Sequence, residues 1–376
     1  MRIAVLTFHY CYNYGALLQA YATRRVLERF GHEVCFPDYV PPYFRQFVSS
    51  AREWKRNWGL RSGRFWSGLP ITLRLKIEVA HRRKAFDRFR QEHLPRVSYA
   101  SKDALAADVD SFGAFWVGSD QVWNMNWMES FDGFYFLDFI AEKSSCRRIG
   151  YAPCFGRKDQ PPELLKRSLP LIQKFDMIGS RNDVTRDLVQ ERTGKSVEMV
   201  CDPTLLWDFS EFVQKQSSGD YILLYSLDKR LLPLGVELAD FYKKHYNLKI
   251  IQLLAESPVS SSQVDERAYG ADPADWVSLL YNAKFIVTDS FHACLFALKF
   301  NKKFVAYSSG WRKMRLADIL AKAGMSERLV VDTVAGVDLE ALTGDPDFSA
   351  FGVYSSEVVE RSRNFIQHAL ASKASL

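Results

Sequence analysis

The sequence predicts an α/β fold in which two doubly wound parallel sheets face each other across a cleft. The chain has 376 residues, which is too long for one simple hydrophobic core and suggests two domains. Short apolar runs alternate with helix-length segments in two series of similar size, separated near Asp202-Pro203-Thr204. We therefore predict an N-terminal domain at residues 1–205, a C-terminal domain at 206–350, and a terminal helix in 351–376 that packs back on the N-terminal domain.

The first series begins with a strand at 2–7, a polar and aromatic loop, and a helix at 16–30. Apolar residues recur on this helix at i+4 spacing, and Gly31 follows it as a helix terminator. A strand at 33–36 completes a βαβ unit, whose crossover should be right-handed. Further strands are predicted at 112–118, 148–152, 177–179 and 197–201.

The second series begins with a strand at 221–225. Its other predicted strands are 249–254, 285–287, 304–307 and 329–331, and its predicted helices are 232–245, 275–282, 293–300 and 314–323. A long helix is predicted at 353–371. The alternation of strands and helices is typical of a doubly wound sheet.

Composition and cysteine usage are those of an ordinary globular protein. Apolar residues make up 47% of the chain and charged residues 25%. The six cysteines show no C-x-x-C pair and no zinc-like spacing, so we expect buried thiols in a reducing compartment and no metal site. The first residues turn polar too quickly for a signal peptide, and no run of about 18 apolar residues occurs. We therefore expect a cytoplasmic protein.

Positive charge is concentrated between residues 51 and 96, inside a region at 43–96 that we predict to be a helical insertion. This segment holds thirteen Lys/Arg and four Asp/Glu, a balance of +9; the whole chain is +6, so the remainder is −3. The cations are mixed with Trp54, Trp58, Phe65 and Trp66, which suits the headgroup region of an anionic membrane. A solvated helical face with its aromatic residues in the core is the alternative. No recognised nucleic-acid module accompanies the charge, so we expect no nucleic-acid partner.

The stretch 285–301 is the most informative part of the chain. A short apolar run, Phe285 to Val287, breaks at Thr288-Asp289-Ser290 and is followed by a helical run. His292 is therefore predicted at the start of a helix and at the carboxyl end of a strand, where open α/β sheets bind ligands. A helix N-terminus also favours anions. The alternative is that Asp289 or Ser290 caps the helix and His292 only packs.

A second turn of this kind follows the predicted strand Phe115–Val117. It reads Gly118-Ser119-Asp120-Gln121, in which glycine lets the backbone approach a ligand closely. Ser119 and Asp120 add polar groups at the carboxyl end of this strand. The sequence thus predicts two polar turns, one in each domain, that face the cleft.

The two turns, in this order, resemble those of the polysaccharide pyruvyl transferase family. Other segments that resemble this family are Asn13-Tyr14-Gly15-Ala16-Leu17-Leu18-Gln19-Ala20, Gly150-Tyr151-Ala152-Pro153, Ser180-Arg181-Asn182-Asp183, Cys201-Asp202-Pro203-Thr204-Leu205, and Asn301 before Phe304-Val305-Ala306. The resemblance implies two Rossmann-like domains in a glycosyltransferase-B-like arrangement. It also implies transfer of the enolpyruvyl group of phosphoenolpyruvate to a sugar of a polysaccharide repeat unit. The implied product is a cyclic pyruvate ketal with release of phosphate, and phosphoenolpyruvate is a co-substrate rather than a cofactor.

The resemblance also implies roles for two residues. His292 matches the general acid, and Arg181 matches the residue that binds the phosphate or carboxylate of the donor. Both roles suit the side chains, because imidazole transfers protons near neutrality and a guanidinium can bind either anion with two hydrogen bonds. The alternative for Arg181 is a surface arginine paired with Asp183 or Asp187.

The saccharide acceptor is assigned to the turns that follow the first strands of the N-terminal domain. Asp120 could accept a proton from a sugar hydroxyl or hydrogen-bond the acceptor, and its alternative role is to cap the following turn. Ser119 and Gln121 are assigned to the acceptor with it. The loop that carries His9, Asn13 and Tyr14 is a further candidate, because aromatic rings stack on sugar faces and amides bind hydroxyls. Its alternative is a packed loop at the domain interface.

One position departs from the family pattern. Some members carry a donor-contacting arginine two positions before the histidine, where this chain has Ser290. We keep Ser290 in the predicted donor site and expect the missing charge from Arg312, Lys313 or Arg315. The alternative is that these three residues form a solvated helix start.

Two other functions stay open on the sequence alone. A nucleotide-sugar glycosyltransferase of the same architecture would need an acidic or amide side chain that contacts the ribose of the nucleotide, and Glu256 and Asp275 are candidates. A catalytically inactive relative that binds carbohydrate is kept open by Ser290. If the acceptor is carried on lipid pyrophosphate, the basic segment 51–96 would dock on the cytoplasmic membrane face or hold that pyrophosphate.

Overall fold

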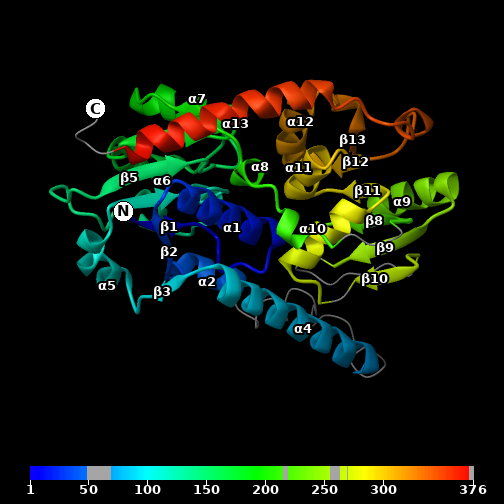
Figure 1. Ribbon diagram of the computed structural model, residues 1–376, viewed down its shortest axis with the longest axis horizontal. Coiled ribbons are helices and arrows are strands. Elements are labelled where there is room, and N and C mark those ends of the chain that lie inside the picture. The colour runs from blue at the N-terminus through cyan, green and yellow to red at the C-terminus, as the bar shows by residue number, and fades with distance from the viewer. Residues whose placement is uncertain (49–68, 215–218, 255–262, 269, 372–376) are drawn as a thin grey trace.

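The computed structural model describes residues 1–48, 69–214, 219–254, 263–268 and 270–371. It contains two parallel sheets, one in each half of the chain, with helices around them (Figure 1). The order of the first sheet is β3-β2-β1-β4-β5-β6-β7, and the order of the second is β10-β9-β8-β11-β12-β13. The prediction of two doubly wound parallel sheets is confirmed.

The first sheet and its helices span most of the first 206 residues. Its strands are β1 (Arg2–Leu6), β2 (Glu33–Asp38), β3 (Arg96–Ser98), β4 (Ala114–Val117), β5 (Arg147–Tyr151), β6 (Met177–Ser180) and β7 (Glu198–Met199). The helices in this part are α1 (Tyr14–Arg29), α2 (Pro42–Val48), α4 (Leu69–His93), α5 (Lys102–Ala107), α6 (Pro162–Gln173), α7 (Asp183–Thr193) and α8 (Pro203–Leu206).

The second sheet and its helices follow. Its strands are β8 (Tyr221–Tyr225), β9 (Lys249–Leu253), β10 (Glu266–Ala268), β11 (Phe285–Thr288), β12 (Lys303–Ser308) and β13 (Leu329–Val331). The helices are α9 (Leu232–Tyr246), α10 (Pro273–Asn282), α11 (Phe291–Lys299), α12 (Lys313–Lys322) and α13 (Ser349–Leu370).

The strand order reverses between β1 and β4 in the first sheet and between β8 and β11 in the second. Every residue of β4 and of β11 is buried, as expected for central strands covered on both faces. Ligands of doubly wound sheets bind outside the carboxyl ends of the strands at such a reversal. Each sheet therefore offers one binding edge, and the loops after β1, β4, β8 and β11 form these edges.

Polar caps set the starts of the helices at these edges. The side chain of Asn13 accepts a hydrogen bond from the Ala16 amide (3.1 Å), so α1 begins at Tyr14, two residues before the predicted start. The side chain of Ser290 likewise accepts a hydrogen bond from the Ala293 amide (3.3 Å), so α11 begins at Phe291. The edge strands β3 and β10 were not predicted, because each has only three residues and no apolar run.

The two domains share a continuous apolar core. Tyr14 of α1 stacks on Trp276 of α10 with ring centroids 5.8 Å apart, and its hydroxyl donates to the Ala271 carbonyl (3.0 Å). Helix α13 lies across both domains in Figure 1. In the N-terminal domain its Ser362 hydroxyl accepts from the Cys201 amide (2.8 Å). Burial of these aromatic and aliphatic side chains stabilises the contact between the domains.

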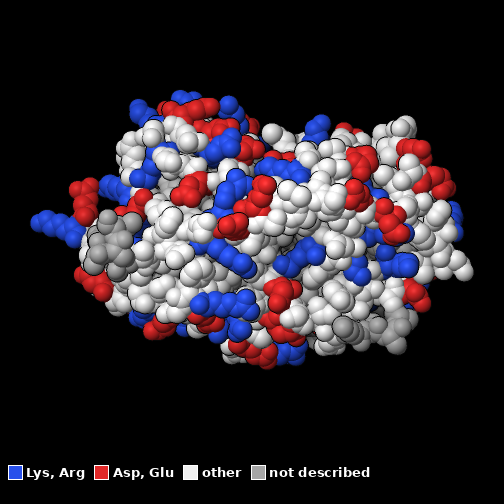
Figure 2. Space-filling view, turned by 45° about the horizontal axis from the view of Figure 1, so that its top comes forward, with Lys and Arg blue, Asp and Glu red and all other residues white. Residues whose placement is uncertain are grey.

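The described part of the basic segment faces inward as well as outward. Arg82 and Arg90 of α4 are buried, and Arg90 donates to the carbonyls of His9 and Tyr10 (both 3.1 Å). Arg90 thus holds the loop after β1. On the face shown in Figure 2, basic and acidic side chains are interspersed. Trp54, Trp58, Phe65 and Trp66 lie outside the described residues, so membrane docking stays a prediction; none of the described helices is long and apolar enough to cross a bilayer.

Candidate active site

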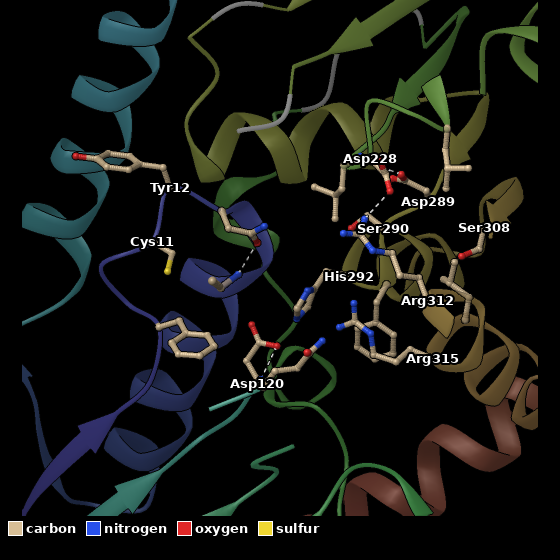
Figure 3. A pocket seen from close by; sticks show the side chains of 18 of the residues that line it. Cys11, Tyr12, Asp120, Asp228, Asp289, Ser290, His292, Ser308, Arg312 and Arg315 are labelled. Carbon is tan, nitrogen blue, oxygen red and sulfur yellow. Dashed lines mark hydrogen bonds and ion pairs between the residues drawn. The ribbon is translucent and has the colours of Figure 1, made fainter. Parts of the chain in front are cut away.

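A cavity of about 540 Å³ lies where the binding edges of the two sheets meet (Figure 3). The N-terminal domain contributes the loops after β1 and β4, and the C-terminal domain contributes the loops after β8 and β11 and the start of α12. The lining residues used below are Phe8, Asn13, Phe44, Asp120, Gln121, Trp127, Asp228, Asp289, Ser290, His292, Arg312 and Arg315. The cavity therefore lies where the strand order of each sheet reverses, which is the expected ligand site of a doubly wound fold.

His292 lies in the first turn of α11 and lines the cavity, although only 7% of its surface is exposed. Gly15 of α1 packs against its ring, where an added Cβ would lie 2.1 Å from Nδ1. The absence of a side chain at Gly15 is thus required for this contact. The N-termini of α1 and α11 meet here, since their caps Asn13 and Ser290 both line the cavity. Two helix N-termini favour an anion beside His292.

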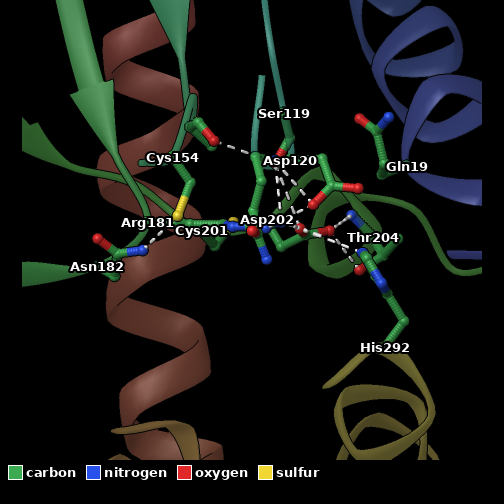
Figure 4. Close-up of polar contacts among 12 residues, drawn as sticks. Gln19, Ser119, Asp120, Cys154, Arg181, Asn182, Cys201, Asp202, Thr204 and His292 are labelled. Atoms are coloured by element: carbon green, nitrogen blue, oxygen red, sulfur yellow. Dashed lines mark hydrogen bonds and ion pairs between the residues drawn. The ribbon is translucent and has the colours of Figure 1, made fainter. Parts of the chain in front are cut away.

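Below the cavity, Arg181 is the centre of a buried polar network (Figure 4). Its guanidinium donates to Ser119 Oγ (3.1 Å), to Asp120 Oδ1 (3.0 Å) and to Asp202 Oδ2. The side chains of Arg181 and Asp202 are only 4% and 2% exposed. Burial by itself lowers the pKa of Arg181, but the charges of Asp202 and Asp120 outweigh it and raise that pKa above its usual range. The guanidinium is therefore a permanent buried charge.

Asp202 connects this network to His292. Its Oδ2 lies 3.7 Å from His292 Nε2, and its Oδ1 accepts from the amide (3.0 Å) and hydroxyl (2.7 Å) of Thr204. Burial opposes ionisation, but the interactions with His292 and Arg181 outweigh it and hold the pKa of Asp202 far below its usual range. An ionised carboxylate therefore faces one edge of the imidazole.

Arg181 lies in the turn between β6 and α7, as predicted, but it does not line the cavity. The alternative of a surface arginine paired with Asp183 or Asp187 is wrong, because Arg186 makes both of these pairs. Arg181 is instead held by the buried carboxylate of Asp202 and the half-buried carboxylate of Asp120. A ligand would have to displace Asp120 or Asp202 before it could bind this guanidinium.

Positive charge at the cavity wall comes from α12 and the turn before it. Arg312 pairs with Asp228 (2.9 Å), and its side chain is 43% exposed. Arg315 is half-buried, its guanidinium carbon lies 5.9 Å from the centroid of the Phe291 ring, and it forms no ion pair with an acidic side chain among the described residues. Burial lowers the pKa of Arg315 from its usual value. Both arginines line the cavity, whereas Lys313 is exposed and does not.

Asp120 caps the turn that follows it and also lies on the cavity wall. Its side chain lines the cavity, and Oδ1 also accepts from the Gln121 amide (2.9 Å), which caps the turn. Gln121 and Asn13 line the cavity as well. Figure 3 shows Asp120 and His292 on neighbouring parts of the cavity wall. The structure thus brings three of the predicted acceptor residues to the cavity.

The other acceptor candidates are buried elsewhere. Ser119 is fully buried in the Arg181 network. Tyr14 packs at the domain interface, and His9 is buried with Nδ1 3.1 Å from the Thr7 carbonyl. Neither Ser119, Tyr14 nor His9 lines the cavity. For Tyr14 and His9, the alternative of a packed loop describes the structure better.

Two acidic residues were missed or misplaced by sequence reasoning. Asp202 was treated only as part of a domain break, although it lies in a segment that resembles the family, which was the signal available. Asp289 does not cap α11, because its carboxylate accepts from the amides of Leu227 (2.6 Å) and Asp228 (2.8 Å). Burial raises the pKa of Asp289 to about 6. Asp289 thereby ties the loop after β8 to the end of β11.

All six cysteines are described, and none forms a disulfide. Five are buried as expected, but Cys11 is half-buried and lines the cavity because it belongs to the loop after β1. Within the described ranges, no three His, Cys, Asp or Glu side chains are grouped to hold a metal ion.

Comparison with known proteins identifies both a family and a fold. A family model described as polysaccharide pyruvyl transferase matches residues 13–310. No curated protein matches the sequence. The UDP-GlcNAc 2-epimerase of Methanocaldococcus jannaschii superposes with a TM-score of 0.52 at 10% identity, over 96% of this chain and 99% of that one. The two-domain, glycosyltransferase-B-like fold predicted from the sequence is confirmed.

Two further structures are similar at lower scores. The same M. jannaschii enzyme in complex with UDP-GlcNAc and UDP gives a TM-score of 0.49 at 12% identity, over 97% of this chain and 98% of that one. Arabidopsis thaliana UGT89C1 complexed with quercetin gives a TM-score of 0.45 at 10% identity, over 98% of this chain and 93% of that one.

Proposed function

The chain belongs to the polysaccharide pyruvyl transferase family, and on that premise we propose that it transfers the enolpyruvyl group of phosphoenolpyruvate to a saccharide as a cyclic ketal. One observation carries the proposal. His292 lies at the meeting point of two helix N-termini, with Arg312 and Arg315 on the same cavity wall. A proton donor beside an anion-binding wall is what protonation of phosphoenolpyruvate needs.

The donor would bind on the side of the cavity that the C-terminal domain lines. Phosphoenolpyruvate carries a phosphate and a carboxylate, and each can be bound by one arginine with two hydrogen bonds. We assign these contacts to Arg312 and Arg315, with the amide end of α11 at Ser290. Arg181 then acts as a positioning residue, because its buried charge fixes Asp120 and Asp202 around His292.

In the proposed reaction, His292 gives a proton to the methylene carbon of the donor. C2 gains oxocarbenium character, one acceptor hydroxyl attacks it, the C2–O bond to phosphate breaks, and a second hydroxyl closes the ketal. Two hydroxyl protons are released: one restores His292 and the other leaves with phosphate. We assign to Asp120, which lines the cavity, the role of accepting a hydroxyl proton, and the ionised carboxylate of Asp202 faces the imidazole.

No observation on the described residues favours a nucleotide-sugar glycosyltransferase. Of its two candidate ribose contacts, Glu256 lies outside the described residues. Asp275 closes the capping box of α10 through the Asp272 amide (3.0 Å) and does not line the cavity. A lipid-pyrophosphate-linked acceptor, with membrane contact through 51–96, remains part of the proposal and rests on the basic composition of that segment.

The function is tested by phosphate release from phosphoenolpyruvate with a panel of β-galactosides and N-acetylhexosamine glycosides. We expect release that requires both substrates and a product that carries a pyruvate ketal, detected by mass spectrometry. The proposal is overturned if no acceptor supports release and phosphoenolpyruvate alone does not raise the melting temperature.

Replacement of Arg315 by alanine should weaken donor binding. The variant loses a charged contact in a half-buried position, so we expect KM for phosphoenolpyruvate to rise about 10- to 100-fold. Lys313→Ala is the matched control, since Lys313 lies on the same helix, is exposed and does not line the cavity. Equal KM values for the two variants would show that Arg315 does not contact the donor.

A further inference from the structure

The two domains line the cavity with different chemistry. Among the described residues of the wall, the lysines and arginines all come from the C-terminal domain and lie beside Asp228 and Asp289; they are Lys229, Arg230, Arg312 and Arg315. The described lining residues of the N-terminal domain include no lysine or arginine. Their charged member is Asp120. An anionic donor therefore fits the C-terminal side, and the N-terminal side suits a ligand without negative charge.

Four aromatic rings of the described residues line this N-terminal side: Tyr12, and a cluster of three that consists of Phe8, Phe44 and Trp127. Phe8 and Phe44 are buried and stack with centroids 4.7 Å apart at an interplanar angle of 24°. The ring centroid of Trp127 lies 5.9 Å from that of Phe8 and 6.0 Å from that of Phe44, and Trp127 is only half-buried. The two phenylalanines thus form a rigid support, and the indole adds a more exposed apolar surface.

The position of Trp127 is fixed by its neighbours. It ends a short 3-10 helix, Met125–Trp127, that Asn124 caps through the Asn126 amide (3.1 Å). The Asn126 side chain donates to the Asp159 carbonyl (3.2 Å), and the Met125 amide donates to Gln160 Oε1 (2.9 Å). A rigid aromatic side chain loses little conformational entropy when it binds a ligand, so this surface is prepared for binding.

Polar side chains surround the aromatic surface. The amides of Asn13 and Gln121 and the carboxylate of Asp120 also line this side of the cavity. Amides and carboxylates bind hydroxyl groups, while an aromatic face covers apolar C–H groups. A pyranose ring presents both kinds of surface, with hydroxyls at its edge and C–H groups on its face.

We propose that Phe8, Phe44 and Trp127 form the acceptor subsite and bind one neutral hexopyranose, with Trp127 stacked on the sugar face. Asn13 and Gln121 then hydrogen-bond its hydroxyls, and Asp120 lies between this sugar and His292. The assignment rests on the proposed function, since it names the acceptor of that same site. The carboxylate of Asp120 disfavours a uronic acid in this position.

The test measures saccharide binding without the donor. Saturation-transfer difference NMR on the full chain would use methyl β-D-galactopyranoside, methyl N-acetyl-β-D-glucosaminide and the methyl glycoside of galacturonic acid with its carboxylate free, beside the variants Trp127→Ala and Trp127→Phe. We expect Trp127→Ala to weaken binding of the neutral glycosides about tenfold and Trp127→Phe to restore most of it. The uronate should bind more weakly than the galactoside to the unaltered protein.

Phe131→Ala is the matched control, because Phe131 is half-buried in the same domain but does not line the cavity. It should bind glycosides like the unaltered protein. Equal binding by Trp127→Ala, or no binding of either neutral glycoside to the unaltered protein, would overturn the subsite. The rise in melting temperature with phosphoenolpyruvate is followed in parallel. Glycoside binding without any such rise would refute pyruvyl transfer and leave the carbohydrate subsite standing.

Discussion

Replacement of His292 by alanine is expected to reduce acceptor-dependent phosphate release about 10²- to 10⁴-fold, the range of a lost general acid. The ring is held between Gly15 and the Asp202 carboxylate, so no neighbouring side chain can take its position without rearrangement. Arg312 and Arg315 are unchanged in the variant. Binding of phosphoenolpyruvate, measured by the shift in melting temperature, should therefore persist while turnover is lost.

The matched control is His368→Ala, because His368 is exposed on α13. It should keep full activity. Retention of more than about a tenth of the activity by His292→Ala would contradict a role in proton transfer. Loss of donor binding together with turnover would instead indicate that His292 is a binding residue.

Replacement of Asp202 by asparagine is expected to lower both stability and activity. The variant removes one of the two carboxylates that neutralise buried Arg181 and the charge that faces His292. Removing one partner of a buried ion pair leaves an uncompensated charge, which costs about 3–5 kcal/mol. We therefore expect the free energy of unfolding at pH 7 to fall by about 3 kcal/mol, as measured by urea unfolding.

The pH dependence identifies the cause of this loss. The pKa of Asp202 is lower in the folded protein than its unfolded value of about 3.9, so its stabilisation is present above pH 4 and is lost as pH falls below that. The difference between the unaltered protein and Asp202→Asn should accordingly shrink on acidification. Asp240→Asn is the control, since the side chain of Asp240 on α9 is 45% exposed and pairs only with Lys244 in the described structure. A difference from this control below about 0.5 kcal/mol would show that the buried network contributes no stability.

Much of the local structure followed from local signals. The strand before His292 is apolar, Ser290 caps the helix after it, and both features are contiguous in the chain. The turn Gly118 to Gln121 likewise follows the apolar strand β4 directly in the chain. For this reason the two polar turns, the position of His292 and the doubly wound fold could be predicted. The short edge strands could not be predicted, because three residues are too few to show a periodicity.

The partners of each side chain required the tertiary structure. Ser119 and Asp120 follow β4, Arg181 follows β6 and Asp202 follows β7. Arg181 is thus 21 to 62 residues away from its three partners in the chain, and only the packing of these strands brings them together. The burial of Arg181 in this network could not be predicted from the residues next to it in the sequence.

The sequence by itself determined the family, the two α/β units and the turn that carries His292, because each depends on residues close together in the chain. Only the tertiary structure decided that Tyr14 packs between the domains and that Arg315, not Lys313, lines the cavity. It also decided that Phe8, Phe44 and Trp127 share one surface. The physical reason is that burial and charge pairing are set by neighbours in space, and these neighbours come from segments that are distant in sequence.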